Sequence, residues 1–340
     1  MRLNTMRTGT VCTCFALAML LLAICPTGCN RNGAKTQSAG ESGKRYKIGF
    51  ANIAEDFSFP VRVREGIERA AKSAGNIDLL LADNRMDGAT AQSNVESFIT
   101  RGVEGIIEFQ TDEKYGRSIM ALCKENKIPV IAIDIPMEGA VFFGVNNYPA
   151  GRMAGEGLGH WIEQHWGGKA DELIMLELPQ SGDIPAQRLR GQREGLESVI
   201  GKFPESKVEH LDSKNTFEEA HRLVTDALTK LPDAHHIAVV CINDDTALGA
   251  IGAAESAGRE NDLAVVAVDA GENGRKEMRK PGTPFVGSTA SFPEKYGDKI
   301  IPLMLKMLKG ESVPPVNYTD HVFITPDNVE QYYPAAKDGK

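Results

Sequence analysis

Polar side chains suited to binding hydroxyl groups recur directly after short apolar segments of this 340-residue sequence. Asparagine both donates and accepts hydrogen bonds, while aspartate and arginine engage neighbouring hydroxyls in pairs. Phenylalanine offers a flat face on which the C–H groups of a sugar ring pack. The residues that follow such segments include Asn52, Phe57, Phe59, Asp134, Asn146, Asn147, Asn243, Asp244, Asp245, Asp269 and Ser291, and a Gly/Pro loop after residue 178 leads to Arg188 and Arg190. Together they predict a binding site for a small polar solute such as a monosaccharide or a related polyol.

Each of these residues taken alone has a simpler interpretation. Asp, Asn and Ser before a helix usually cap it, and we interpret Asp244 and Asp245 as helix caps. Core packing is the alternative for Phe57 and Phe59. The recurrence of polar residues at many segment ends favours a shared site, because ligands bind at the carboxyl ends of parallel strands.

Apolar segments typical of strands alternate with segments of helical periodicity from residue 45 onward. Predicted strands cover 46–51, 78–82, 103–109, 129–134, 140–145, 172–178, 207–211, 237–242, 263–268 and 285–288. Predicted helices cover 61–74, 90–101, 115–126, 149–166, 187–203, 216–231, 246–257, 273–280 and 293–309. Short, nearly continuous apolar strands between helices indicate parallel sheets covered on both faces. The alternation runs twice, which predicts an α/β protein with two doubly wound parallel-sheet lobes.

The first residues have the composition of an export signal. Arg2 and Arg7 precede the apolar run 11–25, which is shorter than the roughly 20 residues that a membrane-spanning helix needs. Thr27 and Gly28 before Cys29 resemble the site at which bacteria attach lipid to a cysteine, although Pro26 stands where Leu is usual. We therefore expect a signal peptide over 1–28, lipidation at Cys29 and a flexible tether over 29–44. A cleaved signal without lipid and a short membrane anchor are the alternatives.

Composition and motifs argue against several other classes of protein. The net charge of −8 disfavours nucleic acid as a partner. We find no catalytic motif and expect no cofactor, since Gly155-Glu156-Gly157-Leu158-Gly159 lies in a helical pattern and not after a strand.

We also expect no metal site. His160 and His165 suit a helix face, His235-His236 has no acidic partner nearby in sequence, and Asn94 closes the calcium-like segment 83–94, where Glu would be needed. Cys123 and Cys241 lie in apolar elements and are predicted to be free core residues.

Several stretches together resemble the periplasmic sugar-binding proteins of the ribose/galactose type. The clearest are Asn147-Tyr148-Pro149-Ala150-Gly151-Arg152-Met153-Ala154-Gly155 and Asn243-Asp244-Asp245-Thr246-Ala247-Leu248-Gly249-Ala250. Arg188-Leu189-Arg190-Gly191 and Val265-Val266-Ala267-Val268-Asp269 add to them, and the similarity extends over about 47–325. The resemblance implies the type I periplasmic binding protein fold, which is shared with the ligand-binding core of LacI-type repressors. A repressor is excluded, because a signal stands where the DNA-binding helices would be.

The resemblance also implies roles for individual residues. Phe57 and Phe59 match the aromatic segment that sandwiches the sugar, and the polar positions match Asp134, Asn147, Arg188, Asn243, Asp269 and Ser291. The sequence departs from the pattern at Ile135, where ribose-type proteins carry an arginine, and at Pro60, where a second aromatic often stands. Glu55 and Asp56 add negative charge. These departures bear on which solute is bound.

The implied architecture has an N-terminal lobe of residues 45–145 plus 291–318 and a C-terminal lobe of residues 146–290 plus 319–336. Hinge crossings are expected near 145–146, 289–291 and 318–319. The implied function is that of the solute-binding protein of an ABC-type sugar transporter, a monomer held by lipid in the periplasm or on the outer face of the cytoplasmic membrane. A receptor that presents the solute to a membrane sensor or chemotaxis partner is the alternative, and a secreted enzyme is a third.

Overall fold

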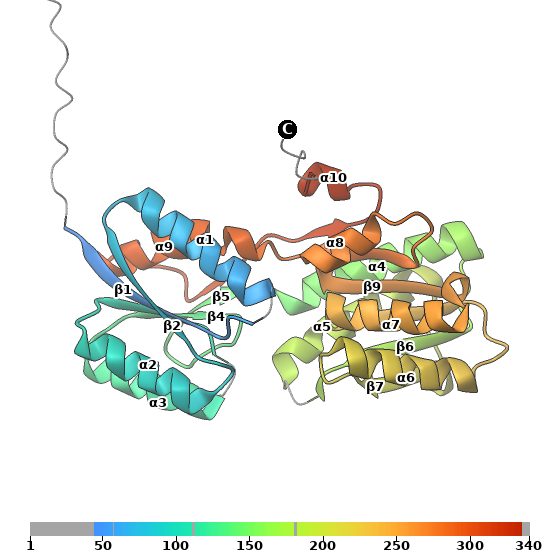
Figure 1. Ribbon diagram of the computed structural model, residues 1–340, viewed down its shortest axis with the longest axis horizontal. Helices are drawn as coiled ribbons and strands as arrows, with labels where there is room; N and C mark the ends of the chain where they lie inside the picture. Colours follow the sequence, from blue (N-terminus) through green and yellow to red (C-terminus); the bar gives the residue numbers. More distant parts are fainter. Residues whose placement is uncertain (1–43, 57, 111–112, 180–181, 335–340) are drawn as a thin grey trace, which may run out of the picture. The chain divides into compact units, whose positions relative to one another are not determined.

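The computed structural model describes residues 44–56, 58–110, 113–179 and 182–334. The predicted signal peptide, Cys29, nearly all of the tether and Phe57 lie outside these residues. Two six-stranded sheets, each flanked by helices, organise the described part of the chain (Figure 1).

The first sheet is built mainly from the first third of the chain. Its strands are β1 (Tyr46–Asn52), β2 (Ile77–Asp83), β3 (Gly105–Glu108), β4 (Val130–Ile133), β5 (Val141–Gly144) and β11 (Val316–Tyr318). They lie in the order β11-β5-β4-β3-β1-β2, and every pairing in this sheet is parallel. Because the strands are parallel, their carboxyl ends meet along one edge, where polar residues were predicted.

Helices cover both faces of the first sheet. They are α1 (Ser58–Ala74), α2 (Gly88–Thr100), α3 (Glu113–Glu125) and α9 (Tyr296–Leu308). One apolar core, including Ile48, Ile67 and Ile300, joins the sheet to α1 and α9. A second core on the other face, including Phe98 and Ile119, joins it to α2 and α3 (Figure 1). The sheet is therefore doubly wound, as the continuous apolar strands predict.

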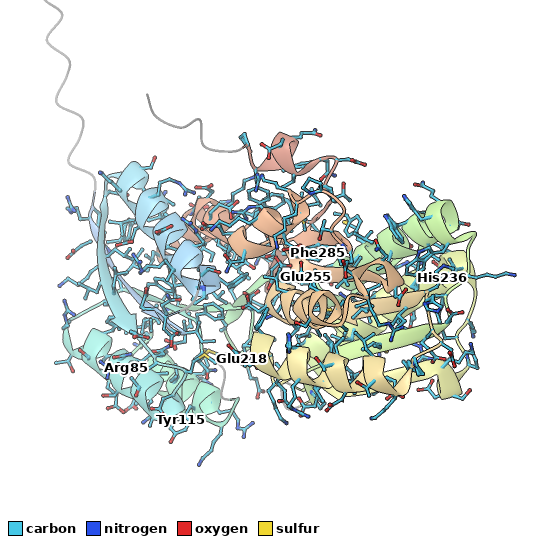
Figure 2. The ribbon with its side chains drawn as sticks, turned by 45° about the vertical axis from the view of Figure 1, so that its right-hand side comes forward. Arg85, Tyr115, Glu218, His236, Glu255 and Phe285 are labelled. Atoms are coloured by element: carbon cyan, nitrogen blue, oxygen red, sulfur yellow. The ribbon has the colours of Figure 1, made fainter. Side chains whose placement is uncertain are left out.

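The second sheet repeats this plan with one antiparallel edge strand. Its strands are β6 (Glu172–Glu177), β7 (Val208–Asp212), β8 (Ile237–Cys241), β9 (Leu263–Asp269), β10 (Phe285–Ala290) and β12 (Val322–Ile324). They lie in the order β12-β10-β9-β8-β6-β7, and β12 runs antiparallel to β10. Both faces bear apolar cores, and Phe285 at the start of β10 is fully buried in one of them (Figure 2).

Five helices accompany the second sheet. They are α4 (Asn147–Trp166), α5 (Asp183–Ile200), α6 (Phe217–Lys230), α7 (Asp244–Ala257) and α8 (Glu272–Met278), and the short α10 (Val329–Tyr332) follows β12. The segment Gly155-Glu156-Gly157-Leu158-Gly159 lies inside α4, which confirms that it is helical and not a nucleotide-binding loop. Among the helices of the described residues, none combines the length and the apolarity needed to cross a membrane.

The chain passes between the sheets three times. It leaves the first sheet after β5, returns after β10, and leaves again between β11 and β12. This arrangement confirms the predicted fold of two doubly wound lobes joined by three crossings.

The structure corrects several predicted boundaries. Helix α5 begins at Asp183 and not at Gln187, because Pro185 is compatible with the first turn of a helix, where its missing N–H costs no hydrogen bond. The helix predicted over 293–309 consists of a 3₁₀ turn at Pro293–Lys295 followed by α9. The three-residue strands β11 and β12 were missed, because so short a segment carries no periodic signal.

Candidate functional site

Arg188 on α5 connects several residues that the sequence singles out. Its Nη1 donates to the carbonyl of Ile242 at 2.6 Å, and its Nε donates to Oδ1 of Asn147 at 3.1 Å. The same Nη1 lies 3.8 Å from Oδ1 of Asp269. The side chains of Arg188 and Asp269 are only 13% and 22% exposed, so this pair is largely screened from bulk water. Three of the predicted ligand residues therefore lie together in the second lobe.

Asp134 brings a carboxylate from the first lobe toward this group. Its Oδ1 accepts the backbone N–H of Val145 at 2.9 Å and the hydroxyl of Tyr296 at 3.3 Å. Burial raises the pKa of Asp134 to about 6, and the positive charge of Arg188 opposes that rise. The charge of Arg188 on α5 therefore acts on Asp134, although α5 and β4 belong to different lobes.

Asp134 and Asp269 share an unusual backbone conformation. The φ angles are 56° at Asp134 and 141° at Asp269, and Ala270 follows with φ of 51°. Non-glycine residues rarely adopt positive φ, and such conformations persist where the surrounding structure enforces them. The turns at the ends of β4 and β9 therefore fix the orientation of both carboxylates.

The helix-cap interpretation of Asp244 and Asp245 is wrong. Asn243 is the N-cap of α7: its Oδ1 accepts the N–H of Thr246 at 3.0 Å, and its Nδ2 donates to Asn215 at 2.9 Å. Asp244 instead accepts the hydroxyl of Ser288 and the N–H of Gly271, both at 2.6 Å. Asp244 therefore holds the turn after β9, next to Asp269.

The remaining predicted residues lie in different surroundings. Phe59 packs edge-to-face on Phe109 and Tyr296, with ring centroids 6.4 and 6.1 Å apart, so part of its surface belongs to the first lobe's core. Ser291 is fully buried just after β10, and its hydroxyl has no hydrogen-bond partner among the described residues. Phe57 lies outside the described residues.

Two residues near these groups were not predicted. Tyr296 is fully buried at the start of α9 and donates to Asp134. His321, between β11 and β12, accepts the N–H of Asn146 through Nε2 at 3.2 Å. Both residues lie at or just after later crossings of the chain between the sheets. They are far from Asp134 in the sequence, so no local pattern connects them with it.

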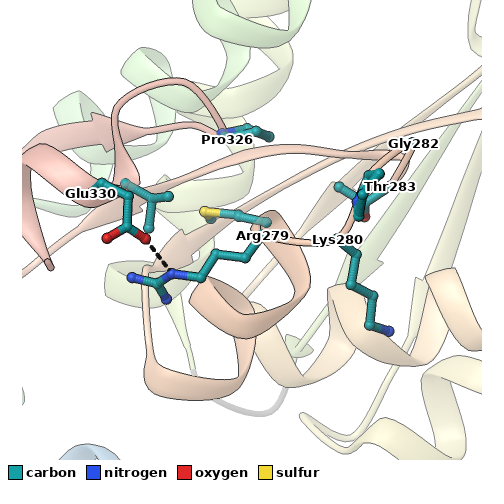
Figure 3. Close-up of a pocket in the computed structure, with 9 residues that line it drawn as sticks. Arg279, Lys280, Gly282, Thr283, Pro326 and Glu330 are labelled. Carbon is teal, nitrogen blue, oxygen red and sulfur yellow. Dashed lines mark hydrogen bonds and ion pairs between the residues drawn. The ribbon is translucent and has the colours of Figure 1, made fainter. Parts of the chain in front are cut away.

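Two hollows on the surface of the described residues are lined by none of the predicted ligand residues that the structure describes. A hollow of about 470 Å³ lies between the end of α8 and α10, where Arg279 forms an ion pair with Glu330 at 2.5 Å (Figure 3). None of the predicted ligand residues lines it. A shallower hollow of about 300 Å³ is lined by Glu55, Asp56 and Arg62, at the carboxyl end of β1.

Within the described residues no cluster of His, Cys, Asp and Glu could hold a metal ion. Cys123 and Cys241 are buried and free, as predicted. Burial raises the pKa of the Cys123 thiol to about 12, which suits a core residue and not a nucleophile.

A model of the periplasmic binding protein domain family matches residues 48–312. The chain belongs to this family. It is therefore a solute receptor and not an enzyme, and it has the two-lobed fold that the sequence motifs implied.

Curated relatives and solved structures agree with this assignment. The chain is 27% identical over 303 residues to a xylitol-binding protein of Mycolicibacterium smegmatis, covering 88% of this chain and 82% of the relative. It is 28% identical over 260 residues to the ribose import binding protein of Salmonella typhimurium, covering 75% and 82%. A solute-binding protein of Actinobacillus succinogenes with bound D-allose superposes with a TM-score of 0.72 at 20% identity, covering 85% of this chain and 100% of that one. At this identity the superposition shows a shared fold.

Proposed function

We propose that this protein captures a small polyhydroxylated solute, a monosaccharide or a related polyol, and presents it to an ABC-type transporter. One arrangement carries the proposal: Arg188 lies 3.1 Å from Asn147 and 3.8 Å from Asp269 in the second lobe, and its charge also acts on Asp134 of the first lobe. The named solutes of the relatives, xylitol and ribose, support the same class of ligand.

The proposed mechanism is closure of two lobes around the solute. Each lobe supplies part of the polar contacts, so a solute that touches both sets stabilises the closed arrangement. Closure removes water from these contacts and strengthens each hydrogen bond. The transporter would then distinguish the closed, loaded protein from the open one.

We assign the solute contacts to Phe57, Phe59, Asp134, Asn147, Arg188, Asn243, Asp269 and Ser291. Asp134 and Asp269 support this assignment because they stand at strand ends with carboxylates aimed by enforced turns. Arg188 supports it because its guanidinium is only 13% exposed and faces both carboxylates. Asn147 accepts a hydrogen bond from Arg188, and Asn243 accepts one from the N–H of Thr246. We propose that their side-chain amides keep these hydrogen bonds when they contact the solute.

Substitution of either central charged residue tests the assignment. We expect Asp134→Ala or Arg188→Ala to weaken solute binding by about 2–5 kcal/mol, because each removes a charged group that would hydrogen-bond to the enclosed solute. A thermal-shift screen of sugars, polyols and inositols identifies the solute, since bound ligand raises the melting temperature. Isothermal titration calorimetry then gives the affinities.

Arg193→Ala is the matched control for this test. Arg193 also lies on α5 but pairs with Glu197 and Glu205, away from the proposed contacts. Its substitution should leave the affinity unchanged. Wild-type affinity in both Asp134→Ala and Arg188→Ala would refute the proposed site.

We propose that the lobes comprise residues 45–145 plus 291–318 and residues 146–290 plus 319–336, and the strand pairing supports this division. Strand β11 pairs with β5 of the first sheet, and β12 pairs with β10 of the second. A hinge between them at Thr319–His321 would let the lobes rotate without breaking either sheet.

We also propose that a lipid on Cys29 holds a monomeric receptor at the outer face of the cytoplasmic membrane. In cells fed labelled palmitate, the wild-type protein and a Cys25→Ser variant should carry label, whereas Cys29→Ser should carry none. Label retained in the Cys29→Ser variant would show that the lipid is attached to another residue, and it would exclude Cys29 as the anchor.

A further inference from the structure

The proposed site contains more carboxyl groups than basic groups. The charge of Arg188 lowers the pKa of both Asp134 and Asp269, whereas the charge of Asp134 raises the pKa of Asp269. The pKa of Asp269 is raised well above its usual value by burial first, with the charges of Asp244, Asp245 and Asp134 adding to the effect. One guanidinium therefore faces at least two carboxylates.

Arg188 is already engaged by neutral protein groups. It donates to Ile242 and Asn147 at 2.6 and 3.1 Å, but its nearest approach to Asp269 is 3.8 Å. The Asp269 carboxylate accepts no hydrogen bond within the part of the chain that the structure describes. Its acceptor capacity is therefore open to a donor on the solute.

Other basic side chains nearby interact mainly with groups other than Asp134 and Asp269; the charge of Arg275, for example, opposes the rise that burial causes in the pKa of Asp244. Arg275 donates to the carbonyl of Ala270 at 2.5 Å and stacks over the ring of Tyr333 at 4.0 Å. Arg62 is 45% exposed and pairs with Glu65 and Glu272. His321 uses Nε2 as an acceptor, and burial together with Arg188 lowers its pKa, so it is neutral near physiological pH.

Further acidic residues surround this region. Asp244 is buried beside the turn that carries Asp269, while Asp245 is exposed in the first turn of α7. Partial burial raises the pKa of Asp245, and the charge of Glu218, in the first turn of α6, adds to this effect (Figure 2). The residue after Asp134 is Ile135, so that position adds no compensating positive charge.

We propose that the solute carries a protonated amine beside its hydroxyl groups, and that Asp269 together with Asp134 binds the ammonium: an amino sugar or an amino-polyol. This inference rests on the proposed function and narrows its ligand class. An ammonium supplies three donors and one positive charge, which match the open carboxyl group of Asp269 and the excess of carboxyl over basic groups. The positive charge of an ammonium would favour the ionised form of Asp269, which burial opposes, whereas a neutral polyol supplies no such charge.

Matched ligand pairs test the proposal. Each pair differs by one –NH₃⁺ in place of –OH: glucosamine with glucose, galactosamine with galactose, 1-amino-1-deoxyribitol with ribitol, and inosamines with the corresponding inositols. Calorimetry near neutral pH should find a pair whose amine binds roughly tenfold to a hundredfold more tightly, the range typical of a hydrogen bond between charged groups.

Asp269→Asn should reduce that preference to near equality. The substitution keeps the shape of the side chain, and asparagine tolerates positive φ. Asp226→Asn, on the exposed face of α6, removes the same charge from the protein and should leave the preference unchanged.

The outcomes separate this inference from the proposed function. If a hydroxyl member binds as tightly as its amine partner in every pair, the ammonium is excluded and the polyol receptor stands. If no member of any pair binds, the proposed ligand class itself is wrong and the inference fails with it. If Asp226→Asn removes the preference as fully as Asp269→Asn does, net charge and not Asp269 is responsible.

Discussion

At the scale of single residues, Glu108 has the most unusual environment outside the proposed site. It ends β3 with 1% of its surface exposed; Oε1 accepts an amide N–H of Asn84 at 2.8 Å, and Oε2 has no partner among the described residues. Burial raises its pKa to about 8, and the hydrogen bond from Asn84 only partly offsets this. Glu108 is therefore protonated in the folded protein near neutral pH.

The pH dependence of stability follows from this pKa. A carboxyl group whose pKa is higher in the folded than in the unfolded protein stabilises the fold most at pH values below its unfolded pKa. For Glu108 the unfolded pKa is 4.5, and the stabilisation is lost as the pH rises toward about 8. We expect Glu108→Gln to remove this decline, because glutamine keeps the shape and the acceptor without ionising. Urea unfolding of both proteins at several pH values measures it. Parallel curves for the two proteins would show that Glu108 is not the responsible group.

At the scale of elements, the contact between α4 and α5 places Arg188. Glycines on both helices allow their backbones to touch: a Cβ at Gly151 would lie 1.9 Å from the carbonyl oxygen of Arg188, and one at Gly155 equally close to that of Gln192. No side chain fits in this space. The close approach keeps Arg188 within hydrogen-bonding distance of Asn147.

Gly155→Ala tests this packing. We expect it to lower the free energy of unfolding by about 1–3 kcal/mol or more, because the helices must separate to admit the methyl group. Gly252→Ala on α7 is the control: its Cβ would meet only side-chain atoms of His221 and Phe217, the nearest at 3.3 Å. There the better helix propensity of alanine should stabilise by up to about 1 kcal/mol. Chemical denaturation of both variants measures the difference, and equal stabilities would contradict the packing argument.

At the scale of the whole molecule, an ion pair joins the lobes. Arg62 on α1 lies 3.1 Å from Glu272 on α8, and Glu272 also pairs with Lys276 at 2.9 Å. These side chains are about half exposed, so the pair contributes only about 0–1 kcal/mol. It exists only in arrangements where the two lobes approach each other at this point.

Glu272→Gln should therefore weaken solute affinity by less than about 1 kcal/mol, and the loss should shrink at high ionic strength, where exposed charges are screened. Calorimetry at low and high salt measures it. Lys276→Gln affects only the ion pair within α8, so it should leave the solute affinity unchanged at both low and high salt. A salt-independent loss in Glu272→Gln would show that the residue acts through something other than this ion pair.

The local sequence was sufficient to predict most helices and strands, the two-lobed α/β class and the candidate ligand residues. These properties depend on periodicity and on polar residues at the ends of apolar segments, which neighbouring residues determine. For this reason Asp134, Arg188 and Asp269 could be proposed as ligand residues from the sequence, and the motifs around Asn147 and Asn243 were sufficient to indicate the family.

Contacts between distant segments were decided only by the tertiary structure. The cap of α7 is Asn243, while Asp244 turns to Ser288 and Gly271, because those groups come from β10 and the turn after β9. Strands β11 and β12 exist only because neighbouring strands supply their hydrogen bonds. The balance of charge around Arg188 likewise depends on which carboxylates the fold brings near it. Electrostatic interactions and strand pairing act between segments that are far apart in the chain, so local sequence patterns cannot predict them.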